Sequence, residues 1–387
     1  MISTNELETP AFVTDENVLR KNLALLRDIA DRASCKLLYS PKASVLSTVL
    51  QNIVREVDGF ACSSPYELRL LNRMCNETQS LHLVSPLIKA EILEEFGDRL
   101  DYLSVNSLSQ WKLLCDYVSP KTRVGLRLNP QLSFVDDSRY DPCRPRSKLG
   151  VPLDKLANIV TEHPDVLRGV SGLHFHNNCE GTDFGDLLAT ARHIQNAIPN
   201  ILRQVDWINI GGGYKFDRSS DHLDFYQAVA IFRDEYGLEV FMEPGAAAVG
   251  RSGTIEATVH DIFSSDDTLI AILDTTTNHM SEVLEFQYEP DVLGHIDGGV
   301  HSYTLAGCTC LAGDVFGDYS FDAPLEIGSK VTFLNMGAYT MSKAQTFNGI
   351  ALPTIYRRRV DGSLDKVGAD ECHELAQYAG GANHAVA

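Results

Sequence analysis

Eight short apolar runs in the first two-thirds of the chain most strongly constrain its fold. Each is followed by a helix-like segment, and the early spacing of roughly twenty residues is typical of a minimal strand–helix unit. The predicted strands are Leu37–Ser40, Gly59–Cys62, Leu81–Val84, Tyr102–Val105, Val124–Leu128, Val170–His176, Trp207–Ile210 and Val240–Glu243. Eight strands that alternate with helices favour an α/β fold of the closed (β/α)8 TIM-barrel type over an open doubly wound sheet.

Two predicted helix starts support this repeat. Ser64-Pro65-Tyr66-Glu67 combines an N-cap serine, a proline at the first helical position and the glutamate of a capping box. The capping pattern recurs from Ser107 to Gln110, after the fourth strand. Helices are therefore expected to begin at both places.

The character of the chain changes after about residue 250, where turns rich in Gly, Asp and Pro separate β-like runs. These runs are Thr254–Phe263, Thr268–Leu273, Val283–Tyr288, His301–Thr304 and Lys330–Leu334. The strand-like Pro10–Thr14 is expected to join the same sheet. We therefore predict a barrel over residues 15–250, and a mainly β C-terminal domain of residues 251–387 completed by residues 1–14.

The composition excludes several partners. The net charge of −19, from 33 Lys and Arg against 52 Asp and Glu, disfavours nucleic acids and anionic membranes. No signal peptide and no bilayer-length apolar run are evident. Nine cysteines without a disulfide-like pattern favour a cytoplasmic location. Cys308 and Cys310 lack a second pair at zinc-ligand spacing, so no metal is expected.

Lys42 is the first of several functional candidates at predicted strand ends, where barrel enzymes place their active sites. It follows Ser40-Pro41, so rigid structure would hold it while its amine stays free. A partly desolvated amine loses proton affinity and becomes a nucleophile suited to Schiff-base chemistry. The alternative is a surface lysine with an apolar stem.

Three glycines, Gly211, Gly212 and Gly213, follow the seventh predicted strand and are the candidate phosphate site. Their backbone N–H groups can approach an anion without side-chain obstruction, and a following helix N-terminus would help. A tight turn would use the same residues. A Rossmann site is disfavoured, because the G-x-G-x-x-G spacing is absent.

Glu243 and two histidines complete the set. A carboxylate at the end of strand eight could keep a heteroaromatic nitrogen protonated, or simply cap the next helical turn. His174 and His176 share one face of their strand, as core histidines or as a ring stacked on a cofactor. Lysine, phosphate site, acid and histidine together predict pyridoxal 5'-phosphate. A Schiff-base aldolase would explain only the lysine and the phosphate site.

The chain resembles the fold type III pyridoxal-phosphate decarboxylases, which include ornithine, diaminopimelate and carboxynorspermidine decarboxylases and share their architecture with alanine racemase. The resemblance covers nearly the whole chain, in order. Besides Lys42, it rests on Gly172–His176, Gly211–Gly213, Glu243-Pro244-Gly245, Cys308–Tyr319 (CTCLAGDVFGDY) and Gly337-Ala338-Tyr339.

The resemblance implies roles for these residues. Lys42 would form the Schiff base, His176 would stack on the pyridine ring and Glu243 would pair with its nitrogen. The phosphate would be held by Gly211–Gly213, Tyr339 and the loop of Gly245 and Ala246. The family commonly has arginine where this chain has Ala246, so backbone amides would substitute. Cys310, reaching in from the partner subunit of a head-to-tail homodimer, would protonate the product carbanion.

Within the group, the carboxynorspermidine (carboxyspermidine) decarboxylases are most similar. The specific stretches are Tyr140–Cys143, Ser147–Gly150, His174–His176 with Cys179-Glu180, His279-Met280 with Val283–Glu285, and Cys310–Asp314. Leu311 stands where ornithine and diaminopimelate enzymes carry a substrate-gripping acid. Asn278 is unlike the subgroup and is expected near the substrate. Glu282, Glu285 and Asp314 are candidate partners for a distal cationic amine.

The predicted function is α-decarboxylation of a carboxylated polyamine, giving norspermidine or spermidine and CO2. The alternatives are a decarboxylase of diaminopimelate, ornithine, lysine or a specialised-metabolite analogue, a racemase on the same barrel, which would need no Cys310, and a non-catalytic regulatory relative.

Overall fold

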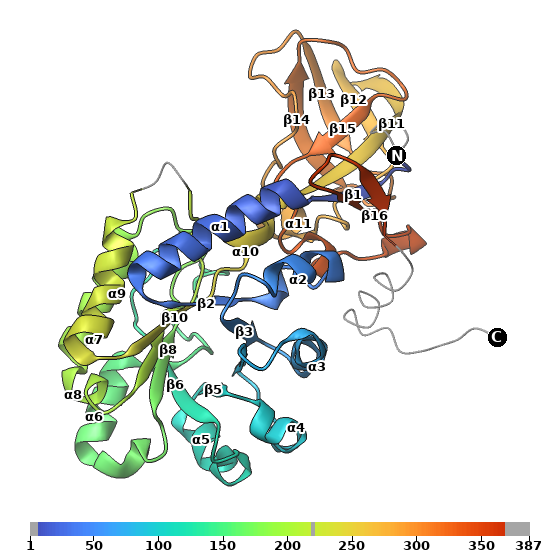
Figure 1. The fold of residues 1–387 in the computed structure, drawn as a ribbon. Helices are drawn as coiled ribbons and strands as arrows, with labels where there is room; N and C mark the ends of the chain where they lie inside the picture. The colour runs from blue at the N-terminus through green and yellow to red at the C-terminus, as the bar shows by residue number, and fades with distance from the viewer. Residues whose placement is uncertain (1–6, 218–220, 368–387) are drawn as a thin grey trace. The chain divides into compact units, whose positions relative to one another are not determined.

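The computed structural model describes residues 7–217 and 221–367, which divide between two compact units (Figure 1). Of the described residues, 23–42, 53–217 and 221–248 form the barrel unit. Residues 7–22, 43–52 and 249–367 form the β-rich unit, which therefore also takes in a short segment that follows the first barrel strand.

The barrel unit is built on a closed ring of parallel strands in the order β2-β3-β4-β5-β6-β8-β9-β10, with β10 pairing back to β2. Their bounds are β2 Lys36–Tyr39, β3 Gly59–Cys62, β4 Ser80–Val84, β5 Tyr102–Val105, β6 Arg123–Asn129, β8 Gly172–Phe175, β9 Trp207–Asn209 and β10 Glu239–Met242. A short strand, β7 (Val151–Pro152), pairs with β6 beside the ring. The predicted TIM barrel and all eight of its strands are confirmed.

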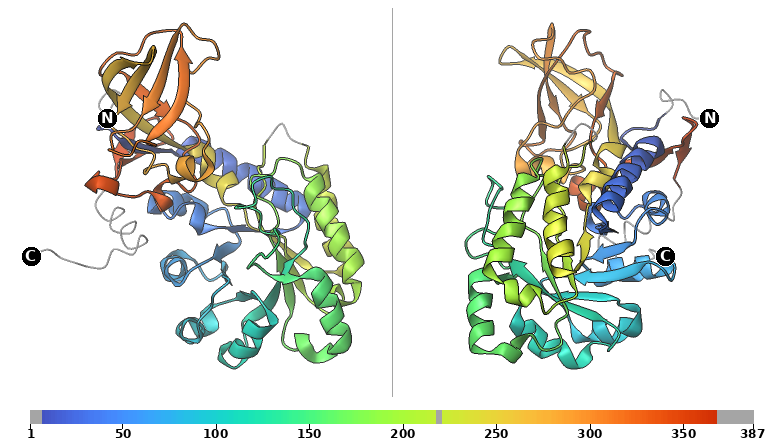
Figure 2. Two further views of the ribbon diagram at one scale, coloured as in Figure 1. Left: turned by 180° about the vertical axis from the view of Figure 1, so that it is seen from behind. Right: turned by 60° about the vertical axis from the view of Figure 1, so that its left-hand side comes forward.

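Helices lie around the outside of this ring (Figure 1 and Figure 2). They are α3 Pro65–Met74, α4 Ala90–Phe96, α5 Leu108–Leu114, α6 Leu153–Glu162, α7 Gly185–Ala197, α8 Pro199–Leu202 and α9 Leu223–Tyr236. Three further helices include residues of both units: α1 (Glu16–Ala33), α2 (Ser47–Ile53) and α10 (Ala246–Val249). Ser64 caps α3 by accepting a hydrogen bond from the Glu67 N–H (3.2 Å). Ser107 caps α5 in the same way, accepting from Gln110 (3.1 Å), so both predicted helix starts are confirmed.

Trp207 fills much of the lower half of the barrel interior, toward the N-terminal ends of the strands, and is fully buried. Two neighbouring strands carry glycine where they face it. A Cβ atom on Gly125 would lie 2.4 Å from the indole, and one on Gly172 would lie 2.0 Å from it. Large rings fill this half, so space for a ligand is expected only toward the C-terminal strand ends.

The β-rich unit is a sheet in the order β14-β13-β12-β11-β1-β16-β17, with β15 also paired to β11. The bounds are β1 Ala11–Asp15, β11 Gly253–Ser265, β12 Thr268–Leu273, β13 His301–Ala306, β14 Val315–Phe321, β15 Lys330–Phe333, β16 Thr354–Arg358 and β17 Leu364–Lys366; short helices are α11 Ser281–Phe286 and α12 Thr340–Lys343. As predicted, β1 joins this sheet, antiparallel to β11 and parallel to β16.

One predicted strand of this unit is wrong. The run Val283–Tyr288 was expected to be β, but α11 spans Ser281–Phe286 and Gln287 ends it in the left-handed conformation. Short apolar runs are ambiguous between strand and helix, and here the helix buries only Ser281 and Val283.

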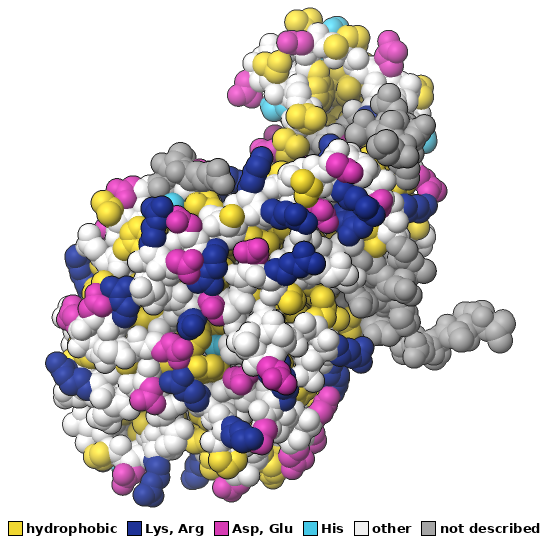
Figure 3. Space-filling view, viewed as in Figure 1, with side chains coloured by type: hydrophobic (Ala, Val, Ile, Leu, Met, Phe, Trp, Pro, Cys, Tyr) yellow, Lys and Arg dark blue, Asp and Glu magenta, His cyan; other side chains and the backbone are white. Residues whose placement is uncertain are grey.

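The face in Figure 3 carries interspersed acidic and basic side chains over the barrel unit. None of the helices within residues 7–217 and 221–367 combines the length and the apolar character that a membrane span needs.

Candidate active site

A row of polar side chains crosses three neighbouring barrel strands near their C-terminal ends. Arg127 on β6 is in register with His174 on β8, which is in register with Asn209 on β9. Residues in register on parallel strands point to the same side of the sheet. Glu243 follows directly after β10, and its Oε1 accepts a hydrogen bond from Asn209 Nδ2 (2.6 Å). These four residues form what we call the upper row.

A second polar row lies near the opposite ends of the strands. It contains His82, Tyr102, Arg123 and Glu239. Arg123 donates to Glu239 (2.7 Å) and to the Tyr102 hydroxyl (2.6 Å), and the His82 ring stacks on that of Tyr102. This lower row has its polar partners within the chain, as expected of a structural network.

The upper row is different, because it contains buried groups without partners. Among the residues that the structure describes, neither ring nitrogen of His174 has a hydrogen-bond partner, although the side chain is only 1% exposed. Its Nε2 lies 3.9 Å from Glu243 Oε1. Within the described residues, no hydrogen bond or ion pair reaches the buried Arg127 guanidinium. Buried polar groups are normally satisfied, so these unsatisfied ones indicate a polar ligand.

The Glu243 carboxyl is buried, which raises its pKa above the usual value. The Lys42 ammonium, the Asn209 amide and the Arg127 guanidinium act in the opposite direction. A buried carboxyl with a raised pKa beside cations is suited to sharing a proton with a bound base.

Lys42 lies in a one-turn 3-10 helix, Pro41–Ala43, directly after β2, and is partly exposed. The backbone N–H of Ser40 bonds to the Pro244 carbonyl (3.5 Å), which holds the ends of β2 and β10 together. Burial lowers the pKa of His176, and the charges of Lys42 and Arg127 lower it further. Lys42, His176 and Glu243 therefore share one rim of the barrel.

His176 has a fixed orientation. Its Nδ1 accepts a hydrogen bond from the Gly212 N–H (3.0 Å), and its lowered pKa keeps the ring neutral, which places the ring proton on Nε2. His174 is also kept neutral, by burial first and then by the charge of Arg127.

The glycine turn packs tightly against the strand ends. A Cβ atom on Gly212 would lie 2.2 Å from the Glu243 carbonyl, and one on Gly213 would lie 2.0 Å from the Asn178 carbonyl. Gly211 and Gly213 also have positive φ angles of 71° and 88°. Only glycine suits these positions.

The amides of this turn are mostly used within the chain, which revises the predicted phosphate cradle. The Gly211 N–H donates to Asn209 Oδ1 (2.9 Å), and the Gly212 N–H donates to His176. Among the described residues, only the Gly213 amide of the three has no partner. The next helix, α9, begins further along, at Leu223, so it does not start at the turn as expected.

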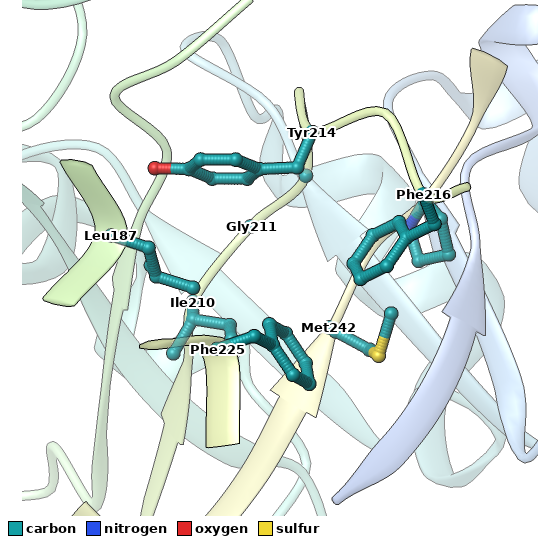
Figure 4. Close-up of a pocket in the computed structure, with 9 residues that line it drawn as sticks. Leu187, Ile210, Gly211, Tyr214, Phe216, Phe225 and Met242 are labelled. Atoms are coloured by element: carbon teal, nitrogen blue, oxygen red, sulfur yellow. The ribbon is translucent and has the colours of Figure 1, made fainter. Parts of the chain in front are cut away.

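A small apolar pocket adjoins the glycine turn. Figure 4 shows the rings of Tyr214, Phe216 and Phe225 and the side chain of Met242 around it. Its volume of about 10 Å³ is barely enough for one water molecule. It is too small for a cofactor and provides an apolar backing for the turn.

Gly245 and Ala246 lie in the loop after β10, where Gly245 is buried and Ala246 begins the four-residue helix α10. Ala246 supplies no side-chain cation. The structure therefore places Lys42, His176, Gly211–Gly213, Glu243, Gly245 and Ala246 in the barrel unit, and the other predicted site residues in the β-rich unit.

In the β-rich unit, Cys310 and Leu311 are exposed in the loop between β13 and β14. The Cys310 thiol donates a hydrogen bond to Asn348 Oδ1 (3.4 Å). Asn278 is buried in the loop after β12, where its amide donates to Thr276 Oγ1 (3.0 Å). Asp314 is buried and accepts hydrogen bonds from threonines of both loops.

Two of the three acids expected to bind a substrate amine, Glu282 and Glu285, are already engaged by a cation of this chain. Lys343 Nζ lies 3.2 Å from Glu282 Oε1 and also pairs with Glu285. The same ammonium lies 5.9 Å from the centre of the Tyr339 ring. Tyr339 itself has a φ of 58°, and its N–H donates to the Ala43 carbonyl (2.8 Å).

Sequence reasoning missed Arg127 and Asn209. Both interrupt otherwise apolar strands, at positions where a barrel interior normally takes a branched apolar residue. An arginine or asparagine within such a run, at the same strand depth as His174, was the available signal.

Known proteins share this architecture and sequence. Residues 17–250 match the family described as pyridoxal-dependent decarboxylase, pyridoxal binding domain. A carboxynorspermidine/carboxyspermidine decarboxylase of Herminiimonas arsenicoxydans is 31% identical, over 93% of this chain and 96% of its own length. A carboxyaminopropylagmatine decarboxylase of Synechocystis sp. is also 31% identical, over 93% of this chain and 92% of its own.

A solved structure gives the same result. Carboxynorspermidine decarboxylase of Campylobacter jejuni, complexed with norspermidine, superposes with a TM-score of 0.83 at 30% identity, covering 93% of this chain and 97% of the other. The family match covers more than half of the chain, and a relative aligned over nearly its full length is 31% identical. The chain is therefore an enzyme that belongs to the family of pyridoxal-dependent decarboxylases.

Proposed function

We propose that this enzyme uses pyridoxal 5'-phosphate to decarboxylate a carboxylated polyamine, carboxynorspermidine or carboxyspermidine, at its α-carbon. The observation that carries the proposal is the shared rim of Lys42, His176 and Glu243 at the ends of three barrel strands. The names of the full-length relatives support the substrate class.

The residues present suit the cofactor. Lys42 would anchor its aldehyde, His176 would lie against the ring and Glu243 would hold a proton on the ring nitrogen. His174 and Arg127, which have no hydrogen-bond partner among the described residues, give this end of the barrel the polar groups that such a ligand needs. Gly213, the loop of Gly245 and Ala246, and Tyr339 would hold the phosphate, without the arginine that the family commonly uses.

Pyridoxal phosphate, when bound, supplies an electron sink for the electron pair left at Cα when CO2 departs. The protein's part is to position and to move protons. Glu243, with its raised pKa, keeps the proton at the ring nitrogen, and Asn209 fixes the carboxyl by its 2.6 Å hydrogen bond. The Cys310 thiol delivers a proton to Cα, after which the amine product is released.

Cys310 acts, in this proposal, in the active site of the partner subunit of a homodimer, as in the enzymes that the chain resembles. The thiol is exposed in its own chain, which supports such a role. We further propose a cytoplasmic location for the enzyme, as expected from its scattered cysteines.

A second candidate substrate is carboxyaminopropylagmatine, since a relative with that activity in its name is as similar as the first. The Lys343 ammonium already neutralises part of the charge of Glu282 and Glu285. These two acids therefore have less negative charge left to bind a cationic group at the distal end of a substrate. Glu282, Asn278 and Leu311 are proposed to contact the substrate.

One experiment tests the proposal directly. The enzyme with its cofactor is given carboxynorspermidine, carboxyspermidine, carboxyaminopropylagmatine, diaminopimelate, ornithine and lysine, and CO2 release is measured. We expect the highest kcat/KM with a carboxylated polyamine. A clear preference for diaminopimelate, ornithine or lysine would reject the substrate class and retain the decarboxylase.

A further inference from the structure

Asp314 is the most heavily hydrogen-bonded carboxylate outside the barrel among the described residues, and it is only 3% exposed. Its Oδ1 accepts from Thr276 Oγ1 (3.0 Å), the Thr277 N–H (2.8 Å) and Thr277 Oγ1 (2.9 Å). Its Oδ2 accepts from the Thr309 N–H (3.0 Å) and Thr309 Oγ1 (2.6 Å). A carboxylate offers about four lone-pair sites, so little capacity is left for a substrate amine.

These bonds join two loops. Thr276 and Thr277 belong to the loop after β12, which carries Asn278, whereas Thr309 precedes Cys310 in the loop after β13. The backbone reinforces the link, because the Cys308 N–H donates to the Thr275 carbonyl (3.0 Å). Within the Cys310 loop, the Gly307 N–H donates to the Asp314 carbonyl (2.7 Å). The space around the carboxyl is closed, since a Cβ atom on Gly307 would lie 2.3 Å from Asp314 Oδ1.

We propose that Asp314 is a positioning residue that holds the Cys310 loop in register with the Asn278 loop, and that it is not a substrate ligand. This inference rests on the proposed function only in assigning Cys310 its role as the proton donor. The carboxylate fixes Thr309 through two hydrogen bonds, and Thr309 Oγ1 accepts a further one from the Leu311 N–H (3.4 Å), so the backbone is held on both sides of Cys310. The orientation of that backbone decides whether the thiol proton reaches Cα.

Two variants, both in the Cys310 loop, weaken the hydrogen bonds of the Asp314 carboxylate. Asp314→Asn puts an amide N–H2 where two donors converge, and Thr309→Val removes one hydroxyl while keeping the side-chain shape. Asp318→Asn is the matched control, because Asp318 is an exposed aspartate of β14 that accepts from another threonine, Thr304 (2.5 Å).

The first readout needs no substrate. The rate of Cys310 alkylation by iodoacetamide is measured in the full-length protein by peptide mass spectrometry, with the exposed Cys115 of the barrel unit as an internal reference. We expect both link variants to speed Cys310 alkylation by about threefold or more, because a loosened loop frees the thiol more often from its hydrogen bond to Asn348. Cys115 in all proteins, and Cys310 in Asp318→Asn, should keep the wild-type rate.

The second readout separates positioning from substrate binding. The substrate is a carboxylated polyamine that the wild-type enzyme decarboxylates. In both link variants, kcat should fall by about tenfold or more while KM changes by less than about threefold. A large rise in KM, with kcat and Cys310 alkylation unchanged, would make Asp314 a substrate ligand and overturn the inference. Unchanged alkylation in both variants would also overturn it.

Failure of the proposed function would look different. Cys310→Ala with the full wild-type rate of decarboxylation would remove the thiol from the mechanism. The alkylation rates would still report whether Asp314 holds the loop.

Discussion

Glu243 and Glu239 are two glutamates at opposite ends of one strand, and their surroundings separate function from structure. Glu239 pairs with Arg123 in the lower row. Glu243 is buried in the upper row, and burial raises its pKa. A carboxyl kept in a costly environment is typical of an active site.

Glu243→Gln should therefore reduce kcat by about 100-fold or more, because the neutral amide cannot hold the proton of the ring nitrogen. The change keeps the side-chain shape and the acceptor for Asn209. Glu239→Gln, the same substitution at the other end of β10, should leave kcat unchanged. Steady-state kinetics of both variants make the comparison, and equal losses would place Glu243 outside the chemistry.

The Asp314 link also predicts how stability depends on pH. Burial alone would raise the pKa of Asp314, but hydrogen bonds from Thr309 and Thr277 outweigh it and hold the pKa below the usual value. The ionised carboxylate therefore stabilises the folded state above the unfolded pKa of about 4, and this contribution is lost as the pH falls through the folded pKa.

Asp314→Asn should accordingly lower the free energy of unfolding by about 2 kcal/mol at neutral pH, and the difference from wild type should shrink below about pH 4. Urea unfolding at several pH values, followed by a signal of the β-rich unit, measures it. A difference that stays constant with pH would mean that the charge of Asp314 contributes nothing.

At the scale of elements, the glycine turn after β9 is fixed by close packing. Gly212→Ala would bring a Cβ atom to 2.2 Å from the Glu243 carbonyl, so the turn or the end of β10 must shift. We expect a loss of about 2 kcal/mol in stability and weaker cofactor binding. Gly250→Ala is the matched control, because its Cβ would meet nothing within 4 Å. Thermal unfolding and cofactor titration compare the two, and equal behaviour would contradict the packing argument.

Elements with strong local signals were predictable. The barrel strands are short and apolar, and the early ones are evenly spaced. Ser64 and Ser107 are N-cap residues, and their capping patterns mark the starts of two helices. The strand β14 was not predicted, because Gly317 and Asp318 interrupt its apolar pattern. The helix α11 was mistaken for a strand, because six residues are too few to show a helical period.

At the scale of the whole molecule, the sequence indicated which strand ends hold functional residues. It did not indicate which backbone amides are already hydrogen-bonded within the chain. The use of the Gly211 and Gly212 amides by Asn209 and His176 depends on register between strands that are distant in sequence. Arg127 likewise has no hydrogen-bond partner among the described residues, and this depends on which side chains the neighbouring strands place beside it. Such facts come from tertiary packing, which local patterns do not encode.

The proposed homodimer makes a quantitative prediction. If each site takes Lys42 from one subunit and Cys310 from the other, Lys42→Ala and Cys310→Ala proteins are each inactive, and mixing restores one intact site in each heterodimer. Random exchange of equal amounts should recover about a quarter of the wild-type activity. Recovery is measured after a cycle of dissociation and reassociation. Absence of recovery, with exchange verified by mass, would reject the shared site.

The central claim is that Lys42 anchors pyridoxal phosphate in this barrel. The most direct measurement is borohydride reduction of the purified protein with its cofactor, followed by peptide mass spectrometry. The account predicts loss of the yellow colour and a phosphopyridoxyl group on Lys42 alone, with Lys42→Ala unlabelled. Labelling of another lysine, or none in protein that decarboxylates its substrate, would contradict it.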